Sequence, residues 1–200
     1  MFFTFDGIDG AGKSTQIDLF VGWLQDAGHD VVTCRDPGTT ELGEAVRAIL
    51  LGAEFPIDCR AEMLLYMACR AQMVDAFIRP ALNEGKVVVS DRYILANVVY
   101  QGSAGGIDPD QIWQVGEIAT QNLLPDLTFV LDIEPTAAAA RVGEKKDRME
   151  TRGIEYFTKV RDGFLQQAKR FPEMHAVIDA SQSIEQIHAD IRVAAEQKLK

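Results

Sequence analysis

The chain has 200 residues, of which 47% are hydrophobic and 25% charged, as is typical of one globular domain spanning 1–200. Its formal net charge of −10 argues against nonspecific binding to nucleic acid or to an anionic membrane, since both need a basic surface. No segment approaches the roughly 20 apolar residues that span a membrane, and Asp6 interrupts the apolar start too early for a signal peptide.

The predicted elements alternate between strands and helices from one end of the chain to the other. In chain order, the apolar patterns predict strand 2–5, helix 13–28, strand 31–34, helix 41–51, helix 59–83, strand 86–90, helix 109–122, strand 127–132, helix 135–141, helix 154–170, strand 176–179 and helix 183–199. Five buried strands alternating with helices predict an α/β fold, with a five-stranded parallel sheet covered by helices on both faces. Ligands of such sheets bind at the carboxyl ends of the strands.

A glycine-rich stretch, FDGIDGAGKSTQ at 5–16, follows the first strand and contains the pattern G-x-x-x-x-G-K-[ST]. Its glycines allow the backbone to turn with positive φ, so that N–H groups can point at a phosphate. Lys13 would reach the β- and γ-phosphates, and the Ser14 hydroxyl would bind Mg²⁺. An ordinary glycine turn before a helix is the alternative. The residues predicted to bind ATP are Gly7, Ile8, Asp9, Gly10, Ala11, Gly12, Lys13, Ser14 and Thr15.

Charged side chains follow the other predicted strands. Arg35 follows the second strand, Asp91 and Arg92 follow the third, and Asp132 ends the fourth. Because the carboxyl ends of parallel strands meet at one edge, these side chains are expected beside the glycine-rich loop. A structural Asp–Arg pair at a strand end is the alternative for Asp91 and Arg92.

Tyr66 and Arg70 are spaced i, i+4, so they share one face of the predicted helix 59–83. An aromatic ring beside a guanidinium suits a pyrimidine, because one stacks and the other donates to a carbonyl. A core tyrosine beside a solvated arginine is the alternative.

Several motifs together carry a resemblance to a known family. They are FDGIDGAGKST, RDPGTT (35–40), LLYMACRAQ (64–72), SDRYILANVVYQG (90–102) and KDRMETRGIEYFTKVR (146–161). In this order they resemble the thymidylate kinases (dTMP kinases), within the P-loop nucleoside monophosphate kinases. The resemblance implies a three-layer α/β/α kinase fold with a short lid. It also implies Mg²⁺-dependent transfer of the γ-phosphoryl group of ATP to dTMP, giving dTDP for dTTP synthesis, by a cytoplasmic homodimer.

The resemblance also implies roles for individual residues. Tyr66 would stack on the base, Arg70 would donate to a base carbonyl, and Tyr100 would crowd the 2′ position of the sugar. The predicted substrate-binding residues are Arg35, Pro37, Tyr66, Arg70, Arg92, Asn97, Tyr100 and Gln101. The predicted metal ligands are Ser14, Asp91 and Asp9. Asp9 is also expected near the acceptor phosphate or the 3′-hydroxyl, and a solvent-exposed loop aspartate is its alternative.

Residues 141–153, rich in arginine and lysine, form the predicted lid. Phosphoryl transfer needs cations on the developing charge, and an arginine of the same chain can supply them. Arg148 is the first candidate and Arg141 the second, beside Lys13, Arg92 and Asp9 as predicted catalytic residues. Where one branch of the family has an arginine in the glycine-rich loop, this chain has Gly10.

Two other functions are weighed against this one. A P-loop kinase of another deoxynucleotide or of a deoxynucleoside is the first; a nucleoside acceptor would have less use for Arg35 and Arg92. A regulatory nucleotide switch is the second, and the chain has no N-K-x-D-type stretch that would select guanine. Cys34, Cys59 and Cys69 match no metal-ligand spacing and are expected as reduced thiols.

Overall fold

A computed structural model of the chain describes residues 1–141 and 153–199. Five strands form one sheet in the order β2-β3-β1-β4-β5, and every neighbouring pair is parallel. The strands are β1 (Phe2–Asp6), β2 (Val31–Arg35), β3 (Val87–Asp91), β4 (Leu127–Asp132) and β5 (His175–Asp179). The predicted five-stranded parallel sheet is therefore confirmed. Each strand differs from its predicted range by at most one residue at either end, because apolar runs bounded by turn residues mark them clearly.

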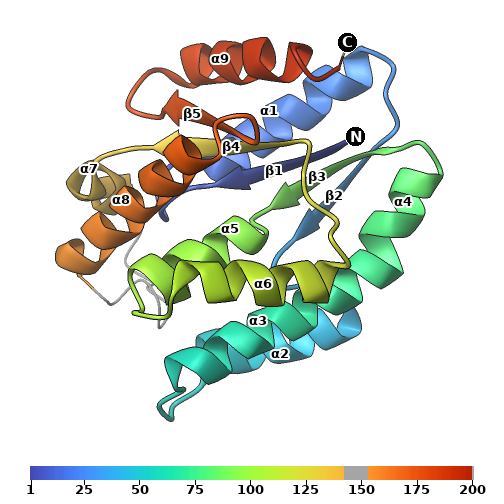
Figure 1. Ribbon diagram of the computed structural model, residues 1–200. Helices are drawn as coiled ribbons and strands as arrows, with labels where there is room; N and C mark the ends of the chain where they lie inside the picture. The colour runs from blue at the N-terminus through green and yellow to red at the C-terminus, as the bar shows by residue number, and fades with distance from the viewer. Residues whose placement is uncertain (142–152, 200) are drawn as a thin grey trace.

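Helices cover both faces of the sheet, as expected for parallel strands (Figure 1). Helices α1 and α9 pack together on one side, whereas α3 to α6 lie on the other (Figure 1). The helices are α1 (Lys13–Asp26), α2 (Glu41–Gly52), α3 (Cys59–Met73), α4 (Arg79–Asn83), α5 (Ile94–Asn97), α6 (Pro109–Thr120), α7 (Pro135–Arg141), α8 (Ile154–Arg170) and α9 (Ile184–Glu196). The three-layer arrangement is confirmed.

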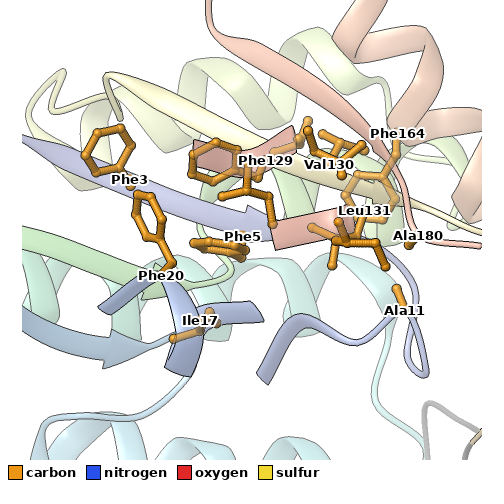
Figure 2. Close-up of a cluster of buried hydrophobic side chains, with 14 of the residues drawn as sticks. Phe3, Phe5, Ala11, Ile17, Phe20, Phe129, Val130, Leu131, Phe164 and Ala180 are labelled. Carbon is orange, nitrogen blue, oxygen red and sulfur yellow. The ribbon is translucent and has the colours of Figure 1, made fainter. Parts of the chain in front are cut away.

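The core is built on the alternating faces of β1. Phe3 and Phe5 contact Phe20 of α1 and Phe129 of β4, with ring centroids 4.8 to 5.9 Å apart (Figure 2). On the opposite face, Phe2 lies edge-on to Tyr93 at 5.0 Å. Because successive side chains of a strand point to opposite faces, β1 joins both apolar layers. Packing on both faces therefore fixes the position of β1, and with it the start of the loop that follows this strand.

Two helical segments differ from the sequence prediction. The predicted helix 59–83 contains a π-helical stretch, η1 (Val74–Ile78), between α3 and α4. Pro80 follows it and has no N–H to donate, which interrupts the regular ladder of hydrogen bonds at this point. The sequence analysis also missed α5 and a second π-helical stretch, η2 (Val98–Ser103), which follows β3. Its β-branched valines have weak helix preference, so tertiary packing decides its structure.

Candidate functional site

A cavity of about 880 Å³ opens at the carboxyl edge of the sheet. The exits of β1, β2 and β3 all contribute to its wall, as expected for a parallel sheet. The predicted site residues that line it are Asp9, Gly10, Ala11, Gly12, Lys13, Ser14, Thr15, Arg35, Pro37, Tyr66, Arg70, Asp91, Arg92, Asn97, Tyr100, Gln101 and Arg141. Residues from 9 to 141 along the chain therefore meet in one space.

The glycine-rich loop connects β1 to the N-terminus of α1. Gly7 has φ of +140°, and a Cβ atom there would lie 2.6 Å from the Leu131 carbonyl oxygen, so only glycine fits. Gly12 is the N-cap of α1 and lies in the left-handed region, and the first N–H groups of a helix have no partner within the helix. The Lys13 ammonium donates to the carbonyl oxygens of Gly7 and Ile8, at 3.1 and 3.0 Å. This arrangement of free N–H groups, helix dipole and ammonium is suited to bind phosphate.

Arg92 lies directly after β3 with its guanidinium against the loop. Its Nη2 donates to Asp9 Oδ1 at 2.5 Å, and its Nη1 donates to the Gly7 carbonyl oxygen at 3.1 Å. The guanidinium also lies over the Tyr100 ring, 5.0 Å from its centroid. Arg92 has φ of +68°, an uncommon value for a residue with a side chain. Its N–H donates to the Phe5 carbonyl oxygen and its own carbonyl accepts from the Ser90 hydroxyl, which hold this conformation.

The pKa values of two aspartates near the loop are shifted in opposite directions. Asp6, the last residue of β1, is fully buried, and neither carboxyl oxygen has a hydrogen-bond partner among the described residues. Burial raises the pKa of Asp6 to about 7, although the positive charges of Arg92 and Lys13 oppose this shift. Burial acts in the same direction on Asp9, but Arg92 and Lys13 outweigh it and lower the pKa of that carboxyl. Asp9 is therefore an anion between two cations at neutral pH.

Tyr66 and Arg70, both on α3, also line the cavity. Arg70 is only 1% exposed, and its Nε donates to Asp36 Oδ2 at 2.6 Å. Its Nη1 donates to Asn97 Oδ1 at 3.0 Å. Asp36 and Asn97 thereby fix the guanidinium plane, which a planar ligand needs from its binding partner.

Positive charge gathers around the cavity of this acidic protein. Among the described residues, its wall carries six cationic side chains and three carboxylates: Lys13, Arg35, Arg47, Arg70, Arg92 and Arg141, against Asp9, Asp36 and Asp91. Arg35 pairs with Glu44 through two hydrogen bonds of 2.8 and 2.9 Å. Arg47 and Arg141 each donate to a backbone carbonyl oxygen, of Pro37 and Ala180 respectively. Such local positive charge attracts polyanionic ligands.

Three predicted site residues lie elsewhere. Gly7 contributes its carbonyl oxygen behind the wall, and Ile8 packs in the apolar core at 2% exposure. Arg148 and most of the predicted lid lie outside the described residues.

Sequence analysis missed Asp36, Arg47 and Glu62. Asp36 and Arg47 line the cavity, and Glu62 supports it from behind. A spacing signal existed for Glu62, because Glu62, Tyr66 and Arg70 lie four residues apart on one helical face.

Within residues 1–141 and 153–199, no helix is both long enough and apolar enough to cross a membrane. The same part of the chain holds no cluster of three or more His, Cys, Asp or Glu side chains arranged as a metal site.

Comparisons with known proteins agree with this geometry. The sequence model of the family described as thymidylate kinase matches residues 5–191. A thymidylate kinase from Caldanaerobacter subterraneus subsp. tengcongensis is 44% identical over 200 residues, covering 100% of this chain and 96% of the relative. One from Rhodopirellula baltica is 44% identical over 184 residues, covering 92% of this chain and 75% of the relative. The crystal structure of thymidylate kinase from Ehrlichia chaffeensis superimposes with a TM-score of 0.80 at 32% identity, covering 98% of both chains.

Proposed function

Because the chain belongs to the thymidylate kinase family and phosphorylates dTMP with ATP, we propose that the cavity at the carboxyl edge of the sheet is its active site. The observation that carries this proposal is that a phosphate-binding loop and a fixed Arg70–Asn97 edge line the same cavity. One end is suited to the phosphates of ATP, and the other is suited to a pyrimidine base. Membership of this family argues against two alternative functions considered from the sequence, a regulatory nucleotide switch and a deoxynucleoside kinase.

At the phosphate end, we propose that the loop from Gly7 to Thr15 binds ATP. The N-terminus of α1 would stabilise the β-phosphate through its free N–H groups. Lys13 would exchange its bonds to backbone carbonyl oxygens for bonds to the transferring phosphoryl group. Phosphoryl transfer requires mainly positioning and charge stabilisation, so a pre-placed cation contributes directly to the rate.

Arg92 would bind the acceptor phosphate and the transferring group together. Its guanidinium is held by Asp9, the Gly7 carbonyl oxygen and the Tyr100 ring, which supports a fixed position between the two substrates. Arg35, Arg141 and Arg148 are further proposed contacts to phosphate, and the role of Arg148 stays a prediction from family resemblance. Arginine suits this task because its guanidinium bonds phosphate oxygens with two N–H groups at once.

At the base end, Tyr66 would stack on thymine while Arg70 and Asn97 bond its edge. Pro37 would form part of the wall beside the base, and Gln101 would support Asn97 through a hydrogen bond of 2.7 Å. Tyr100 is 6% exposed and lines the cavity with its ring. A ring in that position would leave no room for a ribose 2′-hydroxyl, which supports a preference for deoxyribose.

We propose Mg²⁺ as the cofactor, and the oxygen donors of the site fit it. Among the described residues, Asp91 Oδ1 is buried and has no hydrogen-bond partner. Asp9 is an anion at neutral pH, and Ser14 is exposed at the start of α1. Carboxylate and hydroxyl oxygens are ligands that Mg²⁺ prefers, together with substrate phosphates. When bound, Mg²⁺ would neutralise charge that develops on the phosphate oxygens.

We propose further that the chain acts as one kinase domain and forms a homodimer. Met63, Met67 and Met73 of α3 are buried in the chain's own core, so a subunit interface on this helix would use its exposed side chains instead. Leu64 of α3 is 50% exposed and Ile118 of the adjacent α6 is 79% exposed. These apolar side chains support an interface on the α3–α6 face, which light scattering of a Leu64→Glu variant would test.

A cytoplasmic location is also proposed. Cys34, Cys59 and Cys69 form no disulfide in the described part of the chain, as expected in a reducing compartment. Burial raises the pKa of Cys34 to about 12 and that of Cys69 to about 11, which keeps both thiols protonated.

The test of the proposed active site is ADP release measured across a panel of nucleoside monophosphates, with Arg70→Ala and Lys13→Ala beside the wild type. We expect dTMP to be the preferred acceptor, a raised KM for dTMP in Arg70→Ala, and a lowered kcat in Lys13→Ala. If both variants matched the wild type, the cavity would not be the active site.

A further inference from the structure

A continuous row of polar side chains connects the base end of the cavity to Glu62, on the first turn of α3. Arg70 Nη1 donates to Asn97 Oδ1 at 3.0 Å, Asn97 Nδ2 donates to Gln101 Oε1 at 2.7 Å, and Gln101 Nε2 donates to Glu62 Oε1 at 2.8 Å. All four side chains belong to residues that are at most 2% exposed. Arg70, Asn97 and Gln101 line the cavity, whereas Glu62 lies behind it.

Every hydrogen bond in this row points the same way, from the guanidinium toward the carboxylate. Arg70 can only donate, and the Glu62 carboxylate oxygen accepts from Gln101 at the other end of the row. The two amides between them can present either an oxygen or an NH₂ group to a neighbour. The charged ends remove this freedom, because a rotated Gln101 would turn its oxygen toward the carboxylate of Glu62. Rotated Asn97 would turn its NH₂ group toward the guanidinium.

The fixed orientation determines what the site presents to a base. Arg70 is a donor, and Asn97 Oδ1 beside it is an acceptor with a second lone pair. Thymine offers a carbonyl acceptor next to its N3–H donor, which complements this pair. Cytosine offers an amine donor next to an unprotonated N3 acceptor, which opposes it at both positions. Thus the direction of the row selects between the hydrogen-bonding edges of the two pyrimidines, which differ otherwise in the C5 methyl group of thymine.

We propose that Glu62 is a positioning residue that sets the preference for thymine over cytosine, through the orientation of Gln101 and Asn97. The proposal rests on the proposed base-binding role of Arg70 and Asn97. Glu62 acts without touching the base, because its carboxylate fixes Gln101, and Gln101 in turn fixes Asn97. Removal of its charge leaves Gln101 free to rotate, and the Arg70 guanidinium then holds Asn97 from one side only.

The experiment compares kcat/KM for dTMP and dCMP in the wild type and in Glu62→Gln. Glutamine keeps the shape of the side chain but can donate as well as accept, so it no longer fixes Gln101. We expect the dTMP-to-dCMP ratio to fall by about tenfold, the cost of one mismatched hydrogen bond. The KM for ATP should stay within about twofold, and Glu196→Gln, at an exposed position of α9, should leave the ratio unchanged.

A double variant, Glu62→Gln with Gln101→Glu, separates positioning from packing. Its carboxylate at position 101 can again only accept from Asn97 Nδ2, so the thymine preference should recover at least half of its lost factor. A ratio that is unchanged in Glu62→Gln, or that falls without recovery in the double variant, overturns the proposal. Calorimetric Kd values for dTMP and dCMP without ATP give the same comparison if turnover is too low to measure. Failure of the proposed site is distinguishable, since Arg70→Ala would then leave the KM for dTMP unchanged.

Discussion

Replacement of Asp36 by asparagine removes the negative charge that faces the Arg70 guanidinium inside the protein. Both side chains are at most 2% exposed, and the Nε–Oδ2 distance is 2.6 Å. Removal of one partner from a buried ion pair costs about 3–5 kcal/mol, because the other charge is left in a poorly solvated place. Asparagine retains one acceptor oxygen, so we expect the lower end, about 3 kcal/mol. For a domain of this size, the midpoint of thermal unfolding should fall by about 6–12 °C.

Arg70→Met and the double variant complete a thermodynamic cycle. The double variant lacks both charges, so it leaves no uncompensated ion. Its loss of unfolding free energy should therefore be smaller, by at least about 2 kcal/mol, than the summed losses of the two single variants. Denaturant unfolding monitored by circular dichroism measures all four proteins. Glu84→Gln is the matched control, because Glu84 forms a 2.9 Å ion pair with Lys86 at the surface and should change stability by less than about 1 kcal/mol.

Kinetics of the same proteins separate stability from substrate binding. Arg70→Met should raise the KM for dTMP by at least about tenfold, since a buried polar site without its partner discriminates steeply. The KM for ATP should change little, because the phosphate loop is built from other residues. A coupling free energy between Asp36 and Arg70 below about 0.5 kcal/mol would refute the buried ion pair. Equal increases in the KM for dTMP and the KM for ATP would refute a role of Arg70 confined to the base end.

Three further predictions concern the loop, the sugar and pH. Lys13→Ala should lower kcat by at least about a hundredfold while calorimetry shows dTMP binding retained; a loss within tenfold would contradict the role of its ammonium. Tyr100→Ala should raise kcat/KM for ribo-TMP relative to dTMP by about ten- to a hundredfold, whereas Tyr100→Phe keeps the deoxyribose preference; an unchanged ratio in the alanine variant would assign that preference elsewhere. Burial raises the pKa of Asp6 from 3.8 to about 7. Between these pH values the folded protein holds a proton that the unfolded chain has released. The contribution of this proton to stability is therefore full below pH about 4 and is lost as the pH rises to about 7. Asp6→Asn should therefore gain stability over the wild type between pH 5 and 8 in thermal unfolding, and a difference independent of pH would contradict the buried carboxyl.

The strands and the glycine-rich loop could be predicted from the sequence because both depend on neighbouring residues. Val87, Val88 and Val89 form a buried run with a charged residue shortly before and after it, and this pattern predicts a strand without knowledge of its partners. The loop is defined by spacing alone, and its glycines are needed where the structure has positive φ, as at Gly12. The parallel arrangement then follows from the alternation with helices.

The partners of the buried charges could not be predicted in this way. Asp36 and Arg70 are 34 residues apart, and Glu62 and Gln101 are 39 apart, so their contacts depend on how α3 packs against β2 and η2. Segment η2 itself has the sequence VVYQGS, whose valines favour a strand, and only its packing in the fold makes it helical. The sequence thus identified which residues carry charge near the site but not which of them hold one another in place.

The number of buried ionisable groups at this edge of the sheet has an energetic consequence. Asp6, Asp36, Glu62 and Arg70 are all at most 4% exposed, and Arg92 adds an uncommon backbone conformation. Each such group destabilises the fold unless its partners are in place, and well-packed apolar residues are often at least as stable there. The aromatic cluster around β1 must offset this cost, since it packs directly behind the same strand ends (Figure 2). Stability is therefore concentrated in the sheet interior and is lowered at the proposed substrate site. Replacement of a whole buried ion pair such as Asp36 with Arg70 by apolar residues should then stabilise the protein only at the expense of activity.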